Sequence, residues 1–225
     1  MTEELRGEVR RYGRRTFLGV AALGLSSLVW GEAAMRHLRG LETALPPSIV
    51  PNGWRIYTVA SSMPTFDPQT WRLQVGGLVD RPLSLSYDDL RALPRTEQVS
   101  TFHCVTGWTV HDVHWAGVRF DHLLAGAGVR PEAAGLQFTS AEQPYVDSLS
   151  LRQAKLPDVL LAYEQDGKPL AREHGAPVRL LIPEMYGYKS VKWVERIDLV
   201  PEPEPGYWEV RGYDADAWVG RSNGY

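Results

Sequence analysis

The single cysteine of this chain, Cys104, limits what the sequence can build more than any other feature. With one thiol among 225 residues, a disulfide within the chain is impossible. Zinc sites built on thiolates use two to four cysteines, which argues strongly against such a site here. Three roles stay open for Cys104 at this point: a buried inert thiol, a nucleophile, or a single thiolate ligand of a soft metal.

The composition is that of a globular protein with one large domain or two small ones. Hydrophobic residues make up 44% of the chain and charged residues 23%, so a sizeable core can form. The formal net charge of −3 gives no sign of the basic surface that nucleic-acid binding requires. Eight tryptophans, sixteen prolines and many short apolar runs favour a β-rich, loop-rich domain over a helical bundle.

The N-terminal residues differ in character from the rest of the chain. Four arginines between positions 10 and 15 precede an uncharged run over residues 16–30, which is the arrangement of an export signal. The run GRRTFLG at 13–19 is similar to a twin-arginine signal. No clean cleavage site follows, and the apolar run is shorter than the roughly 20 residues that cross a bilayer comfortably. We expect an export signal or membrane anchor at 1–35, a linker at 36–53, and one domain at 54–225.

The body of the chain predicts short strands mixed with short helices. Apolar runs and alternating patterns between turn residues indicate strands, and serine or aspartate before an apolar run indicates a helix start. The predicted fold is therefore α+β and β-rich. Strands are expected at 54–59, 71–75, 98–104, 136–140, 159–163, 178–183 and 191–200, and helices at 86–93, 121–127 and 149–155.

Three blocks, taken in order, carry a resemblance to a known family. The first reads YTVASSMP at 57–64 and WRLQVGG at 71–77; the second reads FHCVTGW at 102–108 and WAGV at 115–118. The third reads HGAPVRLLIP at 174–183 and YGYKSVKWV at 186–194. Together they resemble the sulfite-oxidase superfamily, whose members are oxidoreductases with a molybdopterin-binding domain. The resemblance implies the sulfite oxidase fold and a molybdenum–molybdopterin cofactor (Mo-MPT).

The same resemblance implies roles for individual residues. Cys104 matches the molybdenum ligand, and a soft thiolate suits a metal that the pterin dithiolene already binds through sulfur. The loop at 187–192 supplies flexible backbone, a hydroxyl and two ammonium groups, which suit a phosphate. Contacts to the cofactor are implied for Ser61, Ser62, Thr139, His174, Arg179, Tyr188, Lys189, Ser190, Val191 and Lys192. Ser61 and Ser62 differ from the residues usual in that loop.

Two of these residues also have plainer interpretations. Arg179 can be a strand-edge charge that faces water, but it lies in the apolar run PVRLLI, where a buried guanidinium needs an anionic partner. His174 can be a surface loop residue. In the family it matches a residue that grips the pterin, either as in the sulfite oxidases or in place of an asparagine of the bacterial methionine-sulfoxide reductase.

The residues after Cys104 bear on the substrate. Sulfite oxidases surround the metal with several arginines, whereas this chain has none between Cys104 and Arg119. The pattern Cys-Val-x-x-Trp lies closer to the bacterial periplasmic methionine-sulfoxide reductase catalytic subunits, although Thr106 replaces their glutamate. The run VHDVH at 110–114 matches no common zinc signature, and we expect it near the mouth of the site. The catalytic candidates are Cys104, Thr106 and His111.

The resemblance therefore implies an exported enzyme that transfers an oxygen atom to or from a small substrate. Reduction of a sulfoxide-type substrate is favoured, and oxidation of the sulfite oxidase type is the alternative. No haem-attachment motif or dinucleotide fingerprint is present, so electrons must pass to or from a separate protein, plausibly a membrane haem protein or a cytochrome. The expected location is the periplasm or the outer face of the cytoplasmic membrane. Two further alternatives are a cysteine-dependent hydrolase and a cofactor-free binding module.

Overall fold

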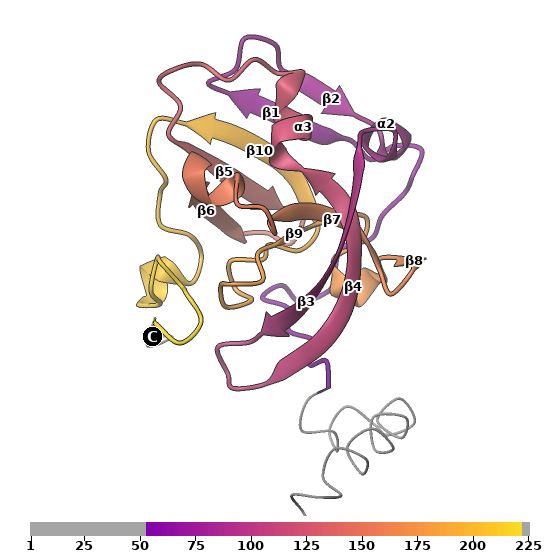
Figure 1. Ribbon diagram of the computed structural model, residues 1–225, viewed down its shortest axis with the longest axis vertical. Coiled ribbons are helices and arrows are strands. Elements are labelled where there is room, and N and C mark those ends of the chain that lie inside the picture. The colour runs from indigo at the N-terminus through magenta and orange to yellow at the C-terminus, as the bar shows by residue number, and fades with distance from the viewer. Residues whose placement is uncertain (1–52, 222–225) are drawn as a thin grey trace, which may run out of the picture. The chain divides into compact units, whose positions relative to one another are not determined.

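The computed structural model describes residues 53–221, which belong to one compact unit of the chain (Figure 1). The predicted export signal and all but the last residue of the predicted linker lie outside the described residues, so both stay predictions. Among residues 53–221, no helix has both the length and the apolar character that a membrane crossing requires.

One five-stranded sheet has the order β2-β1-β10-β5-β6. β1 runs parallel to β10, with Gln74 opposite Arg196, and the other neighbouring pairs are antiparallel. Residues with high strand propensity alternate between the two faces, so every second side chain enters the core. The strands are β1 (Leu73–Gly77), β2 (Leu83–Leu85), β5 (Gly135–Ser140), β6 (Val146–Ser150) and β10 (Val194–Val200).

The second sheet carries the lone cysteine. Its order is β3-β4-β7-β8, with the short β9 paired to β7, and all of its pairs are antiparallel. The β3–β4 hairpin is long, and Figure 1 shows it reaching away from the first sheet. β3 ends at His103, so Cys104 directly follows a strand, as predicted. The strands are β3 (Arg95–His103), β4 (Thr109–Arg119), β7 (Leu160–Gln165), β8 (Lys168–Pro169) and β9 (Arg179–Leu181).

The helices are short, and two of the three α-helices begin at a serine cap. Ser86 and Asp89 form a reciprocal capping box at the first, and Ser150 and Gln153 form another at the third. The middle helix begins at Phe120, one residue earlier than predicted, because β4 runs directly into it and Asp121 accepts from the amide of His122 instead of capping. These elements are α2 (Tyr87–Arg91), α3 (Phe120–Ala125), α4 (Leu151–Ala154), and the 3₁₀ turns η1 (Arg172–His174) and η2 (Glu209–Arg211).

The α+β, β-rich prediction is confirmed, but three local predictions differ from the structure. Residues 54–59 form no strand; the amides of Val59 and Ala60 instead donate to the carboxylate of Glu142. Strand β4 as a whole was not predicted; it covers the run at 110–114 and the WAGV block at 115–118, because the hairpin with β3 continues through both. The short strands β2, β6 and β8 were also not predicted, since none of them shows a clear alternation or an apolar run.

Two hydrophobic clusters hold the sheets together. The larger one joins the inner faces of both sheets and includes Leu73, Phe138 and Leu161, all fully buried. The smaller one lies under the β3–β4 hairpin and contains Phe102, Trp108, Trp115, Leu160 and Leu181. Burial of large aromatic side chains contributes about 2 to 3 kcal/mol each, so this second cluster fixes the strand end that carries Cys104.

Candidate active site

A cavity of about 490 Å³ opens beside Cys104. Its wall comes from five parts of the chain that are far apart in sequence: residues 54–59, 102–108, 142–145, 173–192 and 207–213. Aromatic side chains dominate this wall. They are Trp54, Tyr57, Phe102, Trp108, Tyr145, Tyr188, Tyr207, Trp208 and Tyr213.

Cys104 lies in a tight loop at the tip of the β3–β4 hairpin. Its amide donates to the carbonyl of Trp108 at 2.9 Å, and the amide of Gly107 donates to the carbonyl of Cys104 at 3.0 Å. Gly107 has φ +91°, a conformation that glycine adopts without strain. The thiol is half-buried, and its sulfur lies 3.2 Å from Oγ1 of Thr106. A threonine, rather than a histidine base, is therefore the hydrogen-bonding partner of the sulfur, which disfavours the nucleophile hypothesis.

Arg179 is a buried cation that no carboxylate of residues 53–221 neutralises. It is 2% exposed and donates to the carbonyls of His174 and Ser190, both at 3.2 Å. Its guanidinium lies 5.1 Å from the ring centroid of Phe102, while Nε has no hydrogen-bond partner among the described residues. Burial lowers its pKa to about 10. A buried guanidinium in a cavity wall, with a donor nitrogen that has no partner, has the chemistry that suits an anionic group.

Lys192 and His174 extend this wall. The ammonium of Lys192 donates to the carbonyl of Tyr57 at 2.7 Å and lies 4.0 Å from the centroid of the Trp193 ring. Burial, together with the charge of Arg179, lowers the pKa of Lys192 to about 8. Burial and the same charge lower the pKa of His174 to about 4, so its imidazole is neutral at neutral pH. This part of the wall therefore offers two cations, Arg179 and Lys192, and one neutral imidazole.

The carboxylate of Glu142 does not cancel these charges directly. It accepts from the amides of Val59 at 2.6 Å and Ala60 at 3.3 Å, and from the hydroxyl of Thr58. These donors hold residues 58–60 against the cavity. The segment 54–60 is thus fixed on one side by Glu142 and on the other by Lys192, without pairing to either sheet.

A metal at Cys104 needs ligands that the protein does not supply. Among residues 53–221, no group of three or more histidine, cysteine, aspartate and glutamate side chains gathers to hold a metal ion. A single thiolate is a poor site on its own but a normal part of a site whose other ligands come from a sulfur-rich cofactor. The unused donor of Arg179 and the ammonium of Lys192 suit the anionic parts of such a cofactor.

The structure brings seven of the predicted site residues to this cavity and leaves six away from its wall. The seven are Cys104, Thr106, His174, Arg179, Tyr188, Ser190 and Lys192. Of the others, Ser61 and Ser62 lie in an exposed loop, and Val191 is buried in the main core. The remaining three are Thr139, Lys189 and His111, each placed elsewhere for its own reason.

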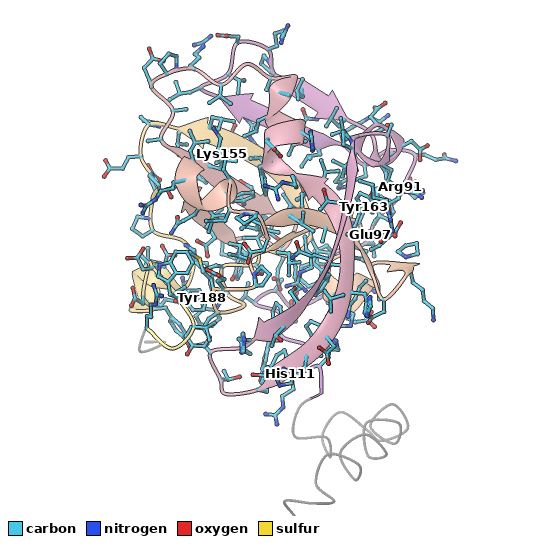
Figure 2. The ribbon with its side chains drawn as sticks, viewed as in Figure 1. Arg91, Glu97, His111, Lys155, Tyr163 and Tyr188 are labelled. Atoms are coloured by element: carbon cyan, nitrogen blue, oxygen red, sulfur yellow. The ribbon has the colours of Figure 1, made fainter. Side chains whose placement is uncertain are left out.

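Thr139 and His111 are displaced by strand geometry. Thr139 lines a second, polar cavity with Glu195 and Arg196, while the next residue, Ser140, faces the opposite side and donates to the carbonyl of Lys192 at 2.7 Å. Neighbouring residues of a strand point to opposite faces, so a one-residue difference moves the side chain across the sheet. His111 lies near the start of β4 (Figure 2), but its side chain is exposed and absent from the cavity wall, and its Nδ1 lies 3.4 Å from Oγ1 of Thr101.

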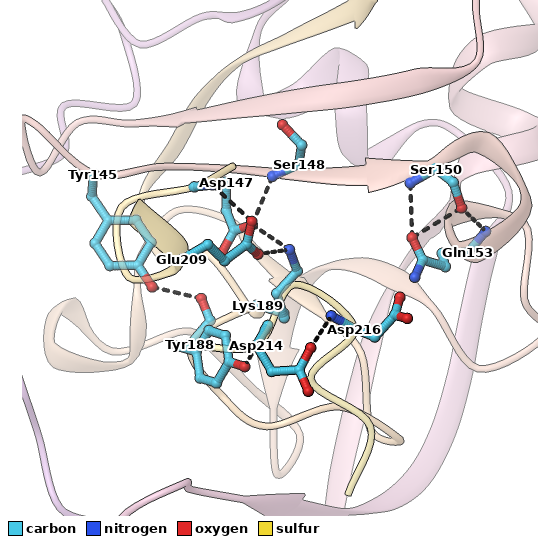
Figure 3. A network of polar contacts seen from close by, with 11 residues as sticks. Tyr145, Asp147, Ser148, Ser150, Gln153, Tyr188, Lys189, Glu209, Asp214 and Asp216 are labelled. Carbon is cyan, nitrogen blue, oxygen red and sulfur yellow. Dashed lines mark hydrogen bonds and ion pairs between the residues drawn. The ribbon is translucent and has the colours of Figure 1, made fainter. Parts of the chain in front are cut away.

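The ammonium of Lys189 is already neutralised within the protein. It is 3% exposed and donates to Asp147 at 2.5 Å and to Glu209 (Figure 3). Burial opposes the charge of Lys189, but the two carboxylates outweigh that effect and raise its pKa. The prediction that Lys189 contacts the cofactor phosphate therefore differs from the structure. Lys189 instead anchors η2 and the chain that follows it to β6.

Sequence reasoning missed part of the cavity wall. Trp54 contacts the rings of Phe102 at 5.0 Å and His174 at 4.8 Å, and the carboxylate of Glu142 holds the segment that follows Trp54. Tyr207, Trp208 and Tyr213 also line the cavity. Nothing local marks these residues, since each reaches the cavity through contacts that are distant in sequence.

Comparisons with known proteins agree with this geometry. The family model described as "Oxidoreductase molybdopterin binding domain" matches residues 60–208. The uncharacterized oxidoreductase YuiH of Bacillus subtilis (strain 168) is 42% identical over 159 residues, which cover 69% of this chain and 80% of that protein. Human mitochondrial sulfite oxidase is 36% identical over 180 residues, which cover 67% of this chain and 33% of that protein.

Two further similarities concern a reductase and a solved structure. The protein-methionine-sulfoxide reductase catalytic subunit MsrP of Campylobacter jejuni is 31% identical over 160 residues, covering 64% of this chain and 54% of that protein. The crystal structure of the sulfane dehydrogenase SoxCD from Paracoccus pantotrophus matches with a TM-score of 0.60 and 30% identity, over 64% of this chain and 41% of that chain. The chain thus spans a third to about half of the sulfite oxidase, the reductase and SoxCD.

Proposed function

Because the chain belongs to the family of oxidoreductase molybdopterin-binding domains, it is a molybdopterin-dependent oxidoreductase, and we propose that it reduces a small, neutral sulfoxide-type substrate outside the cytoplasm. Arg179 carries the proposal: a buried cation with an unused donor shares one cavity with the chain's only thiol. Loss of an anionic ligand from such a cavity would leave an uncompensated charge, which proteins rarely retain without a function.

The cavity suits a molybdenum–molybdopterin cofactor. Cys104 would supply the thiolate ligand, Arg179 and Lys192 would bind anionic groups, and neutral His174 would donate or accept one hydrogen bond. Bound there, the cofactor supplies a metal that exchanges two electrons and an oxygen atom with the substrate. Trp54, Tyr57 and Trp108 line the cavity with aromatic surface, which would strengthen these electrostatic contacts by lowering the local polarity.

The loop beside the thiol favours a neutral substrate. Between Cys104 and Trp108 the chain contributes Val105, Thr106 and Gly107, so no side chain of this loop carries a charge. A sulfoxide oxygen accepts a hydrogen bond, and its carbon substituents suit an apolar wall. Val105 and Trp108 supply an apolar surface beside the thiol.

Oxidation of sulfite is the second candidate. The observation in its favour is that Arg55, Arg179 and Lys192 all line the cavity, and sulfite is an anion. Arg179 is buried and Lys192 half-buried, however, and the proposed cofactor accounts for both. Only the exposed Arg55 would then remain for a free anion, which favours the neutral substrate.

The electrons would come from a separate redox protein, since the sequence has neither a haem-attachment motif nor a dinucleotide fingerprint. The relative from Campylobacter jejuni is named a catalytic subunit, and one from Azospira oryzae a putative reductase subunit, so these relatives are described as parts of larger systems. We extend this to the present chain and expect a membrane haem protein or a cytochrome as partner. The arginine-rich N-terminus supports export by the twin-arginine route.

The test is molybdenum per chain, measured by inductively coupled plasma mass spectrometry on protein from a host that makes the cofactor, together with assays in both directions. We expect near-stoichiometric molybdenum, turnover of a methyl sulfoxide with a reduced viologen dye, and little oxidation of sulfite with ferricyanide. The variant Cys104→Ser should lose turnover whether or not it keeps the metal. Folded protein without molybdenum would overturn the cofactor assignment, and efficient sulfite oxidation without sulfoxide turnover would overturn the substrate class.

A further inference from the structure

We propose that Thr106 donates a hydrogen bond to the sulfur of Cys104, that Tyr57 orients this hydroxyl, and that the pair raises the reduction potential of the metal bound to Cys104. The inference rests on the proposed function, in that Cys104 must be the metal ligand. It gives Tyr57, a residue of the segment 54–60 that belongs to neither sheet, the role of orienting the Thr106 hydroxyl.

The loop geometry fixes Thr106 against the sulfur. Oγ1 of Thr106 lies 3.2 Å from Sγ of Cys104, and the two backbone hydrogen bonds that close the loop hold both residues in place. A thiolate that ligates a metal carries no proton and can only accept. In the metal-bound form, the Thr106 hydroxyl must therefore be the donor of this contact.

Tyr57 determines where the Thr106 proton points. The phenol oxygen of Tyr57 lies 3.5 Å from Oγ1 of Thr106. A threonine hydroxyl has one proton and two lone pairs, so a bond received from Tyr57 leaves its single proton free for the sulfur. The ring of Tyr57 lies 6.4 Å from that of Trp108 at an interplanar angle of 29°, and the carbonyl of Tyr57 accepts from Lys192. These contacts hold the phenol above the loop.

The expected consequence is a change in how strongly the sulfur donates electrons to the metal. A hydrogen bond to a ligand sulfur withdraws charge from it, weakens its donation to the metal and favours the reduced state. Such bonds tune the potentials of blue-copper and iron–sulfur centres in the same way. Thr106 is then a ligand-tuning residue, and Tyr57 is a positioning residue that acts through it.

The experiment compares wild-type holoenzyme with Thr106→Val, Thr106→Ser, Tyr57→Phe and, as the matched control, Thr101→Val. Thr101 lies on the same hairpin and contacts His111, not the cysteine. Molybdenum content is measured first. The midpoint potential is then followed through the paramagnetic resonance signal of the one-electron-reduced metal during a redox titration.

We expect Thr106→Val to lower the midpoint potential and to change the resonance signal, and Thr106→Ser to restore both. Tyr57→Phe should shift the potential in the same direction by less, and Thr101→Val should leave it unchanged. Metal-loaded Thr106→Val with the wild-type potential would overturn the inference while the proposed function stands. Tyr57→Phe at the surface keeps the fold in place, so its wild-type potential would overturn the orienting role even if Thr106→Val failed to fold. Wild-type protein without molybdenum would overturn both proposals.

Discussion

The guanidinium carbon of Arg179 lies 5.1 Å from the centroid of the Phe102 ring, and Phe102 precedes the cysteine by two residues along β3. The same guanidinium lies 5.5 Å from the ring of Trp115 on β4. One buried cation thus contacts both strands of the hairpin that presents Cys104. Cation–π contacts in a desolvated setting are worth about 2 kcal/mol, so the anion receptor and the thiol are positioned together.

Replacement of Arg179 should weaken cofactor binding and leave the free energy of unfolding almost unchanged. Burial lowers the pKa of Arg179 to about 10, which corresponds to a penalty of about 3 kcal/mol on its charge. Arg179→Met removes that penalty but loses two hydrogen bonds to carbonyl groups, worth about 1 kcal/mol each, and the cation–π contact with Phe102, worth about 2 kcal/mol. We expect the free energy of unfolding of the cofactor-free protein, measured in urea, to change by less than about 1 kcal/mol. Molybdenum retention should fall about tenfold or more, because the anionic partner loses its charge-assisted bonds.

Two variants control this result. Leu181→Ala, in the same strand and fully buried, should lower the free energy of unfolding by about 2 to 5 kcal/mol. Arg130→Gln removes an exposed arginine that pairs with Asp80 and should leave both quantities close to wild type. Full molybdenum retention by Arg179→Met would contradict the assignment of Arg179 as the anion receptor.

A methyl group at Gly187 should disturb the contact between Phe102 and Arg179. A Cβ there would lie 2.4 Å from Cζ of Phe102, a side chain that is packed between Trp54 and Arg179. Gly187→Ala should therefore lower the free energy of unfolding by about 1 to 3 kcal/mol and reduce molybdenum retention. In Gly126→Ala the nearest atom, on Leu83, is 3.8 Å away, so that control should be neutral in a thermal or urea melt. Equal melts for the two variants would show that Phe102 has room to move.

The burial of Arg179 was predictable because its sequence neighbours are apolar. Arg179 stands in the run PVRLLI, which contains β9, and such a run favours burial of the residues within it. Cys104 was predictable as the end of a strand for the same local reason. The α+β class followed from the alternation of short apolar runs and turn residues, which is also local.

The predictions that differ from the structure concern residues whose position depends on contacts with residues distant in the sequence. Thr139 and Ser140 are equivalent in the sequence pattern, and only the pairing of β5 with β10 and β6 decides which of them faces the cavity. Lys189 lies 42 residues from Asp147 and 20 from Glu209. The sequence near Lys189 therefore gives no sign that two carboxylates neutralise its charge. Residues 54–59 have the composition of a strand, but they pair with no strand of either sheet.

Lys192 should make cofactor retention depend on pH. Burial and the charge of Arg179 lower its pKa to about 8, so the ammonium begins to lose its proton above that pH. A bound anion raises this pKa, and retention should therefore fall as pH rises above 8, by at most about tenfold per pH unit. Molybdenum that stays with the protein after dialysis at pH 7, 8 and 9 measures the effect. Lys192→Arg keeps its charge across this range and should give a flatter profile, whatever its absolute level. Parallel losses in the two proteins would assign the pH dependence to another group.

The cluster of Asp147, Lys189 and Glu209 predicts a second, independent effect of pH, this time on stability (Figure 3). Two buried carboxylates face one ammonium, and Oδ2 of Asp147 has no hydrogen-bond partner among the described residues. Burial raises the pKa of Asp147 to about 7; Lys189 lowers it, and the second carboxylate raises it further. The spare oxygen of Asp147 is where the proton would reside.

The sign follows from proton counting. An unfolded aspartate has a pKa near 4, so between about pH 4 and pH 7 the native state holds a proton that the unfolded chain has lost. The free energy of unfolding should therefore fall as pH rises through this window, by at most about 1.4 kcal/mol per pH unit, and level off above pH 7. The raised pKa of Lys189 acts only at more alkaline pH, since that contribution is lost above the ordinary lysine pKa.

Asp147→Asn isolates the contribution of Asp147 to this pH dependence. Its side-chain oxygen can still accept from Lys189 and from the backbone N–H of Ser148, but the side chain does not titrate. Urea unfolding of the cofactor-free protein at pH 5, 6, 7 and 8 should show the wild type losing its advantage over Asp147→Asn as pH rises to about 7. Asp80→Asn, at an exposed ion pair, controls for the loss of a carboxylate as such. A difference between wild type and Asp147→Asn that stayed constant from pH 5 to pH 8 would mean that Asp147 is already ionised in the folded protein, with Lys189 compensating both carboxylates.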